Sequence, residues 1–179
     1  GDILEAWYPG AEGGKAIASL LFGKESPMGR LPISIPRSVG QLPDYYSQPK
    51  GSGGHYVEGP GQPLYPFGFG LSYSRFAYSD LQFQKTENAK DVFIDATFKV
   101  TNIGKTPATD IQQLYITDET SSVVTAIRHL VGFTRCTLAP GASTTQHIRL
   151  DKTALSLWNL KGEQVVEPGS FTLALSKYA

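Results

Sequence analysis

The segment Leu64-Tyr65-Pro66-Phe67-Gly68-Phe69-Gly70-Leu71-Ser72-Tyr73 divides the chain into two parts of different character. The sequence before it has the pattern of an α/β domain, and the sequence after it has the pattern of an all-β domain. Its glycines allow backbone angles that other residues avoid, whereas its four aromatic rings carry apolar area that is usually buried. A flexible linker would be rich in Gly and Ser and would lack such rings. The segment is therefore predicted to be a packed junction between two lobes, with an ordinary loop as the alternative.

The overall composition is typical of a globular protein and gives no sign of a polyanionic partner. The 179 residues include 16 Lys and Arg and 16 Asp and Glu, so the formal net charge is zero. We expect neither a nucleic-acid partner nor a membrane partner, since no apolar run is long enough to span a bilayer. The first residues lack the pattern of a signal peptide, and periplasmic, secreted and cytoplasmic locations all stay open.

The single cysteine, Cys136, excludes an intrachain disulfide. It lies in a strand-like run, where a small thiol side chain usually belongs to the core. A catalytic thiol would need a nearby histidine in a cleft, which is the less favoured alternative.

Residues 1–46 are predicted to form a short strand–helix–strand unit. The apolar run 3–8 fits a buried strand, and the sequence that opens with Gly13-Gly14 fits a helix that ends near Gly23. Residues 31–35 fit an edge or irregular strand, because Pro32 cannot donate a ladder hydrogen bond. Such a unit cannot cover both faces of a parallel sheet. We therefore expect these residues to be the truncated tail of a larger α/β sandwich domain.

Residues 76–179 change to a period of two, which is the pattern of half-buried strands. Val92, Ile94, Ala96, Phe98 and Val100 alternate with more polar residues, which predicts that these five side chains point inward. Further strands are predicted at 111–117, 131–138, 144–150 and 171–175, with a short pair at 155–158 and 164–166. In the first of these, Leu114 and Ile116 share one face, and Gln113 and Tyr115 share the other; in 144–150, Ile148 and Leu150 point inward.

About a hundred residues of short alternating strands favour an immunoglobulin-like antiparallel β-sandwich, of the fibronectin type III-like kind because a Cys…Trp…Cys pattern is absent. The fold class is accordingly mainly β, with the sandwich preceded by the tail of an α/β domain. The expected division is 1–46 for the α/β remnant, 47–75 for an irregular loop and the aromatic junction, and 76–179 for the fibronectin type III-like domain.

Residues 47–62 form a long polar, Gly-rich loop, and long loops in compact proteins are often functional. His55, Tyr56 and Glu58, together with Tyr45 and Tyr46 just before the loop, are types that can stack on or hydrogen-bond a ring-shaped polar ligand. His55, Tyr56 and Glu58 are therefore our substrate-proximal candidates. The alternative is a surface crossover that wraps the junction.

No catalytic centre follows from the residues alone. The Gly10–Gly14 turn matches neither a P-loop nor a dinucleotide fingerprint, and no nucleophile elbow is present. The histidines lack the spacing of zinc ligands, so neither a metal nor a cofactor is expected. The carboxylates that could in principle form the pair needed for glycoside hydrolysis are Glu5, Glu12, Asp44 and Glu58. Nothing in the sequence pairs any two of them, so the chain by itself is predicted to be inactive.

Several motifs in fixed order nevertheless resemble the C-terminal part of glycoside hydrolase family 3 β-glucosidases. In the first part of the chain they are Ala6-Trp7-Tyr8-Pro9-Gly10-Ala11-Glu12-Gly13-Gly14, Leu21-Phe22-Gly23, Gly29-Arg30-Leu31-Pro32, Pro36-Arg37-Ser38-Val39-Gly40-Gln41-Leu42-Pro43 and the junction itself. In the second part they are Gln113-Leu114-Tyr115, Leu130-Val131-Gly132-Phe133, Leu138-Ala139-Pro140-Gly141 and Val166-Glu167-Pro168-Gly169.

The resemblance implies a three-part, retaining, exo-acting β-glycosidase that removes terminal non-reducing β-linked glucose. Its nucleophile and acid/base would lie in N-terminal catalytic domains that precede the matched segment, so neither role passes to a residue of this chain. β-Xylosidase and β-N-acetylglucosaminidase are alternatives within the family, and a non-catalytic structural or carbohydrate-binding sandwich is an alternative outside it. A homodimer is left open. The sequence departs from the family's pattern at Ala11, and the length of the 47–62 loop varies among relatives, so the loop's role does not transfer.

Overall fold

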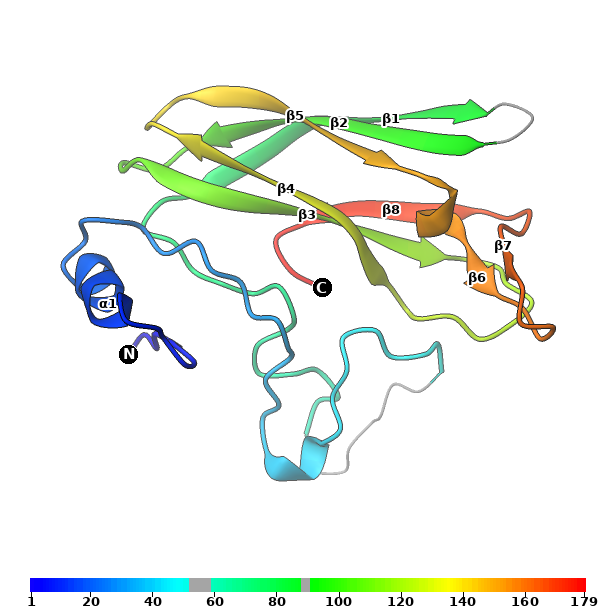
Figure 1. The fold of residues 1–179 in the computed structure, drawn as a ribbon, viewed down its shortest axis with the longest axis horizontal. Helices are drawn as coiled ribbons and strands as arrows, with labels where there is room; N and C mark the ends of the chain where they lie inside the picture. Colours follow the sequence, from blue (N-terminus) through cyan, green and yellow to red (C-terminus); the bar gives the residue numbers. More distant parts are fainter. Residues whose placement is uncertain (52–58, 88–90) are drawn as a thin grey trace.

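The computed structural model describes residues 1–51, 59–87 and 91–179, which form a β-sandwich and an extended N-terminal segment lying along one side of it (Figure 1). The segment contains one α-helix, α1 (Gly13–Leu21), and a short 3₁₀ turn, η1 (Val39–Gln41). The sandwich strands are β1 (Phe76–Glu87), β2 (Val92–Asn102), β3 (Ala108–Asp118), β4 (His129–Leu138), β5 (Ser143–Leu150), β6 (Leu157–Trp158), β7 (Gln164–Val165) and β8 (Phe171–Ser176), with a 3₁₀ turn, η2 (Lys152–Leu155), before β6.

The strands form two three-stranded antiparallel sheets, ordered β1-β2-β5 and β4-β3-β8, and β6 pairs with β7 in a small hairpin. Figure 1 shows the two sheets stacked face to face. The predicted antiparallel sandwich is therefore confirmed, together with the strands predicted from the alternating pattern.

The core lies between the two sheets, and β2 contributes its centre. Ala96, Phe98 and Val100 are fully buried, as the alternation predicted, and Ile148 and Leu150 meet them from β5. Burying a side chain as large as that of Phe98 stabilises a fold by roughly 1.5–3 kcal/mol. Because successive strand residues point to opposite faces, the odd-numbered neighbours on β2 face outward.

The first strand of the sandwich, β1, was not among the predicted strands. Its ladder with β2 shifts between Ser79 and Gln82, and Asp80 at this bulge has a φ of 56°. One extra residue reverses the inside–outside phase, so Tyr78 packs against the core before the bulge whereas Phe83 lies opposite Ala96 after it. The strand therefore lacks the continuous period of two by which strands are recognised.

The N-terminal segment keeps the predicted helix but not the two predicted strands. Helix α1 ends as expected, with Gly23 at a φ of 68° just beyond it. Residues 3–8 form no strand, and Ile3 and Tyr8 are exposed rather than buried; of residues 31–35 only Ile35 forms a bridge, to Tyr65. The prediction was wrong because a strand needs a neighbour for its backbone hydrogen bonds, and the described part of the chain places none beside residues 3–8.

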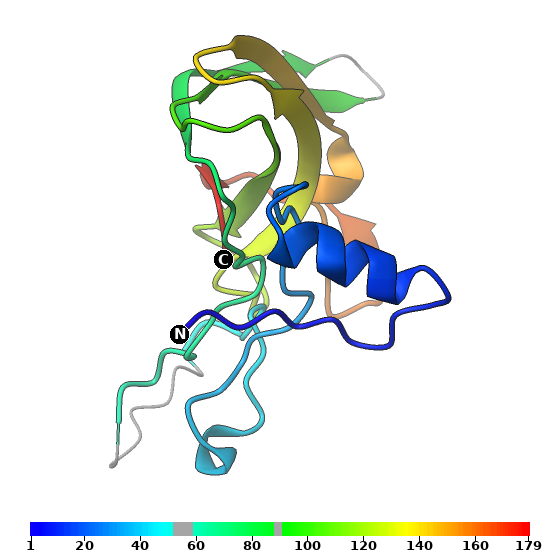
Figure 2. The same ribbon diagram turned by 90° about the vertical axis from the view of Figure 1, so that its left-hand side faces the viewer.

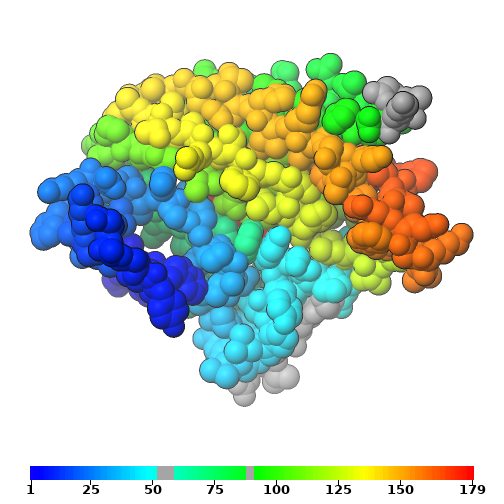
Figure 3. Space-filling model, in the orientation of Figure 1, coloured from blue at the N-terminus to red at the C-terminus, as the bar shows by residue number. Residues whose placement is uncertain are grey.

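The apolar face of helix α1 is only partly covered in the described structure, with Ile17 and Leu20 half-buried. Gly13 is its only buried residue, whereas Leu21 at its end and the following Phe22 are 67% and 81% exposed. Figure 2 shows the helix outside the two sheets, and Figure 3 shows the N-terminal segment as a separate layer on the surface of the sandwich. An amphipathic helix is stabilised mainly by covering such a face, so this one is incompletely packed.

Candidate functional site at the junction between the two regions

The junction is held by stacked aromatic rings. The Tyr46 ring stacks on Phe67 with centroids 3.9 Å apart, and Tyr65 stacks on Phe69 at 5.2 Å. Phe69 in turn meets Tyr178, at the end of the chain, at 5.8 Å. The predicted packed junction is thus present, although its aromatic rings are half-buried and Tyr73 is exposed.

Gly68 lets the junction lie directly on the outer face of β3. It has a φ of 80°, and a Cβ at this position would come within 2.2 Å of Gln113 Oε1 and 2.8 Å of the Tyr115 hydroxyl oxygen. Gln113 Nε2 donates to the carbonyl oxygens of Gly68 and Lys177, and the Tyr115 hydroxyl donates to Gln113 Oε1. Burial raises the pKa of Tyr115, so the phenol stays protonated as this donor. The face of β3 that carries Gln113 and Tyr115 is therefore buried beneath the junction.

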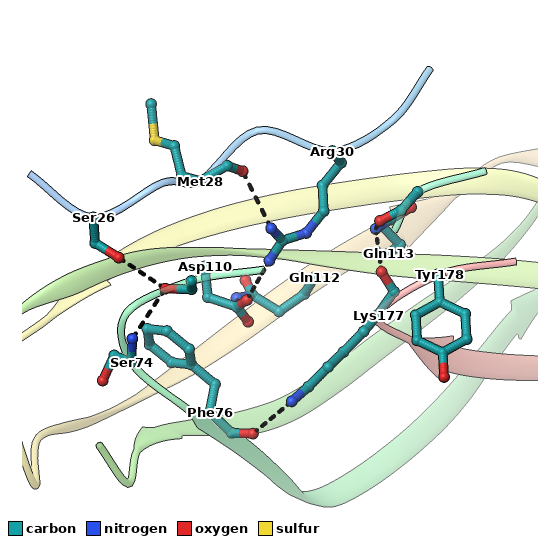
Figure 4. A network of polar contacts seen from close by, with 12 residues as sticks. Ser26, Met28, Arg30, Ser74, Phe76, Asp110, Gln112, Gln113, Lys177 and Tyr178 are labelled. Carbon is teal, nitrogen blue, oxygen red and sulfur yellow. Dashed lines mark hydrogen bonds and ion pairs between the residues drawn. The ribbon is translucent and has the colours of Figure 1, made fainter. Parts of the chain in front are cut away.

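Arg30 connects the N-terminal segment to the opposite face of β3. Its Nη2 donates to Asp110 Oδ1 at 2.9 Å, and both side chains are almost fully buried (Figure 4). The second carboxylate oxygen accepts bonds from the Tyr78 hydroxyl (2.6 Å) and from Gln112 Nε2 (2.8 Å). Burial raises the pKa of Tyr78, and the bond to Asp110 raises it further. A buried ion pair whose oxygens are also hydrogen-bonded fixes the relative position of the two regions.

This ion pair was not predicted from the sequence, although the sequence contains a sign of it. By alternation Asp110 lies on the same face of β3 as Leu114, which belongs to the core. A carboxylate on a core face needs a cation, because an unpaired buried charge is costly. Arg30, within the quoted motif Gly29-Arg30-Leu31-Pro32, supplies it from 80 positions earlier in the chain.

Two serines link the junction to the turn after α1. The Ser26 hydroxyl lies 2.9 Å from that of Ser72 and accepts a bond from the backbone N–H of Tyr73, while the Tyr73 hydroxyl donates to the Leu20 carbonyl oxygen. The backbone N–H of Ser74 donates to the Ser72 hydroxyl. The helix is therefore tied to the junction by polar contacts, while Leu21 at its end and the following Phe22 stay exposed.

Both ends of the predicted substrate loop are anchored. At the start of the loop, the backbone N–H of Lys50 donates to the Thr125 carbonyl oxygen, and the backbone N–H of Ile127 donates to the Gln48 carbonyl oxygen. The Lys50 ammonium also donates to the Asp118 carbonyl oxygen. At the end of the loop, the Gln62 carbonyl oxygen accepts bonds from the side chains of Arg37 and Gln41. The first anchor joins the loop to the β3–β4 connection of the sandwich.

The substrate-proximal candidates His55, Tyr56 and Glu58 lie outside the described residues. Of the two tyrosines before the loop, Tyr45 is 65% exposed, whereas Tyr46 is engaged in the stack on Phe67.

The described carboxylates among the catalytic candidates are engaged by their own neighbours. Glu5 accepts a bond from the backbone N–H of Trp7, and Glu12 pairs with Lys15 at 3.8 Å. Asp44 accepts a bond from Gln48, and partial burial raises its pKa. We assign none of them a catalytic role.

The described residues contain neither a group of side chains that could hold a metal ion nor a reactive thiol. No three His, Cys, Asp or Glu side chains there are grouped so that they could hold a metal ion. Burial and the nearby Asp110 raise the pKa of the Cys136 thiol, which keeps it uncharged and unreactive. No helix in residues 1–51, 59–87 and 91–179 has the length and apolar character needed to cross a bilayer.

The fold and its contacts define a class of protein: a fibronectin type III-like sandwich preceded by a segment that packs on it through an aromatic contact and a buried ion pair. Residues 2–73 match the glycosyl hydrolase family 3 C-terminal domain, and residues 110–178 match the fibronectin type III-like domain. The chain belongs to glycoside hydrolase family 3, of whose members it corresponds to the C-terminal region.

Relatives and solved structures agree with this assignment. The chain is 41% identical over 182 residues to the periplasmic β-glucosidase of Salmonella typhimurium, covering 96% of this chain and 24% of that protein. It is 40% identical to a β-xylosidase of Formosa agariphila, covering 97% of this chain and 25% of that protein. The crystal structure of β-glucosidase from Listeria innocua in complex with gluconolactone superimposes with a TM-score of 0.90 at 30% identity, covering 97% of this chain and 26% of that one. The chain thus spans about a quarter of the length of these proteins.

Proposed function

We propose that this chain acts as the C-terminal region of a retaining, exo-acting β-glucosidase that removes terminal non-reducing β-linked glucose. The observation that carries the proposal is the similarity over nearly the whole chain to the periplasmic β-glucosidase of Salmonella typhimurium. From the family resemblance we expect the nucleophile and the acid/base to lie in domains that precede this region. The substrate would be a β-glucoside or β-linked oligosaccharide bound by the complete enzyme.

The exposed apolar surface of the N-terminal segment supports a role in completing a larger domain. Ile3, Trp7 and Phe22 are all more than half exposed, although side chains of this kind are usually buried. We propose that they pack against the rest of an α/β sandwich domain. The Arg30–Asp110 pair would then hold the sandwich in a fixed position on that domain.

β-Xylosidase activity is the second candidate, because the Formosa agariphila relative is nearly as similar as the Salmonella one. The two activities differ in the sugar that the catalytic domains accept. The described residues of this chain therefore favour neither one.

A chimera tests the proposal. We would replace the corresponding C-terminal quarter of the Salmonella β-glucosidase with this chain and assay p-nitrophenyl β-glucoside and β-xyloside. We expect glucosidase activity well above that of the truncated host, which lacks this quarter, and none from residues 1–179 alone. A folded chimera as inactive as the truncated host would contradict the proposed role. Turnover by the isolated chain, after removal of contaminating enzyme, would show that it contains a catalytic pair of its own.

The 47–62 loop is proposed to contribute to substrate binding near the active-site mouth, in its own subunit or across a homodimer. The proposal rests on the residue types His55, Tyr56 and Glu58 and on the anchoring of the loop ends described above. Replacing residues 55–58 with Gly and Ser in the active chimera should raise KM for longer oligosaccharides and change kcat on a small aryl glucoside much less. Unchanged kinetics on both substrates would leave the loop as a surface crossover.

A further inference from the structure

The outer face of the β1-β2-β5 sheet contains a shallow hollow of about 220 Å³. Six of the residues that line it come from alternate positions of the three strands, namely Gln82 and Gln84, Asp95 and Thr97, and His147 and Arg149. Phe83 lies between the two glutamines and completes the lining. No residue of the N-terminal segment contributes, and Figure 1 shows that segment on the opposite side of the sandwich.

The strand register arranges the six polar residues in two parallel rows. Gln84 lies opposite Asp95, which lies opposite Arg149; Gln82 lies opposite Thr97, which lies opposite His147. Neighbouring strands are about 4.8 Å apart, so each row presents three polar groups at a regular spacing. Their neighbours along β2 and β5 are core residues, so these side chains point away from the core.

Asp95 holds the charged side of the hollow in place. Arg149 donates to it through both Nε (2.9 Å) and Nη2 (3.0 Å), and His147 Nε2 lies 3.2 Å from the same carboxylate. The bond from Arg149 keeps the pKa of Asp95 below its usual range, so the carboxylate is charged. The Arg149 guanidinium also lies over the Phe93 ring, 5.2 Å from its centroid. These contacts orient Arg149 and His147 in advance, which lowers the entropic cost of binding a ligand.

The other polar side chains of the hollow are free to bond to a ligand, as far as the described residues are concerned. The side-chain amides of Gln82 and Gln84 and the Thr97 hydroxyl have no hydrogen-bond partner among the described residues. Each amide has a donor and an acceptor side by side, and the hydroxyl can act as either. The hollow therefore offers a set of paired donors and acceptors beside an oriented guanidinium.

We propose that this hollow binds a glycosyl unit of a neutral β-linked glucan. The hydroxyls on neighbouring carbons of a sugar ring are each donor and acceptor, which matches the two rows of amide, hydroxyl and charged groups. Asp95 and Arg149 neutralise each other, so the hollow offers a polyanion little net attraction. Drug-sized ligands need roughly 300–1,000 Å³, so a smaller hollow suits a unit of about one sugar ring. The choice of glucan rests on the proposed β-glucosidase function, whereas the existence of a glycan site does not.

The test is a titration of the isotope-labelled 179-residue chain, followed by NMR, with laminaritetraose, cellotetraose and xylotetraose. A shallow, open site predicts weak binding with a Kd of about 1 mM. We expect a glucan oligosaccharide to shift the amide signals of the residues that line the hollow. The absence of any saturable shift there with all three sugars would overturn the proposal. Stronger binding of xylotetraose would overturn the assignment to glucan.

A matched pair of variants locates the site. The double variant Gln82→Ala/Gln84→Ala removes the two unused amides and should weaken binding at least about fivefold, the scale of a lost hydrogen bond. The control, Lys99→Ala/Thr145→Ala, changes two exposed residues that lie opposite each other on the same sheet but outside the hollow. Equal weakening by both variants, or by neither, would overturn the location.

This test is independent of the chimera assay. Binding by the chain together with an inactive, folded chimera would refute the proposed enzymatic role and leave the glycan site standing. An active chimera together with a chain that binds no sugar would refute the glycan site alone.

Discussion

The sandwich and the N-terminal segment both carry amphipathic sequence patterns, but only the sandwich buries its apolar face. Phe98 at the centre of β2 is fully buried, whereas Phe22 at the end of α1 is 81% exposed. Each phenylalanine lies in or beside an element that the sequence predicted correctly. The comparison shows that a pattern predicts which side chains need covering, while burial depends on whether a second element lies against them.

The contacts between the two regions also differ in kind from those inside the sandwich. The core of the sandwich is apolar, whereas the interface combines the aromatic contact of Phe69 with Tyr178 and a buried ion pair between Arg30 and Asp110. Buried ion pairs stabilise only modestly but penalise any arrangement that separates them. We infer that the interface fixes one relative position of the two regions, whereas the core provides most of the stability.

The largest predicted effect contrasts the two phenylalanines. Phe98→Ala should lower the free energy of unfolding by about 3–5 kcal/mol, because it leaves a cavity between the sheets. Phe22→Ala in the same chain should change it by less than about 0.5 kcal/mol, since the ring is exposed. Denaturant unfolding measures both. Similar losses for the two variants would break the contrast, whereas a large Phe22→Ala loss in the chimera alone would show that another domain covers this ring.

The second prediction concerns the ion pair between the regions. Asp110→Ala should cost about 1.5–3 kcal/mol, because Arg30, Tyr78 and Gln112 all lose a charged partner. Arg30→Ala should cost a comparable amount, and the double variant should cost clearly less than the sum of the two. Hydrogen exchange should also show the junction amides losing protection before those of β2. Additive losses would mean that the two residues act independently.

The third prediction concerns the reason for glycine at two positions. It separates a lack of space for a Cβ atom from the need for a positive φ angle. Gly68 and Gly141 have similar positive φ angles, 80° and 76°, but only at Gly68 would a Cβ meet other atoms. Gly141→Ala should cost about 1–2 kcal/mol for the backbone alone. Gly68→Ala should cost about 1 kcal/mol more, because the methyl group displaces Gln113 and Tyr115. Thermal unfolding of the two variants measures the difference, and equal shifts in Tm would mean that the junction is loosely packed on β3.

The smallest predicted effect is a pH dependence. Burial lowers the pKa of His129 from its ordinary value of 6.5, so the unfolded chain binds a proton more readily than the folded one. The contribution of this residue to stability is therefore complete above pH 6.5 and is lost as the pH falls from there through the folded-state pKa. His129→Gln should reduce the fall in Tm between pH 7.5 and pH 5.5. An unchanged fall in Tm would assign the pH dependence to other groups. The matched control is His147→Gln, measured over the same pH range.

Much of the sandwich could be predicted from the sequence because its strands expose one face and bury the other. The inside–outside orientation of the side chains on β2 and β5 followed from alternation alone, and helix α1 followed from its spacing and from Gly23. Strand β1 could not be predicted, since a bulge at Asp80 reverses which of its side chains point inward and which point outward. The prediction for residues 3–8 was wrong in the opposite way. Their pattern is that of a buried strand, but a strand also needs a neighbouring strand for its backbone hydrogen bonds.

The candidate site was less accessible to sequence reasoning. The sequence identified the junction by its aromatic residues, and it placed Gln113 and Tyr115 on the face of β3 away from Leu114. It did not reveal that this face is covered by Gly68. This residue lies 45 positions away in the chain, and a glycine has no side chain from which a contact could be predicted.

By itself the sequence determined the elements that depend on near neighbours in the chain: the alternating strands, the helix and its end, the tight turns and the aromatic junction. The tertiary structure alone decided what lies against each face. It joined Arg30 to Asp110, placed Gly68 on Gln113, and aligned residues from three strands around the hollow at Asp95. The physical reason is that local periodicity fixes the direction of a side chain, whereas the partner it meets is set by packing between segments that are distant in sequence.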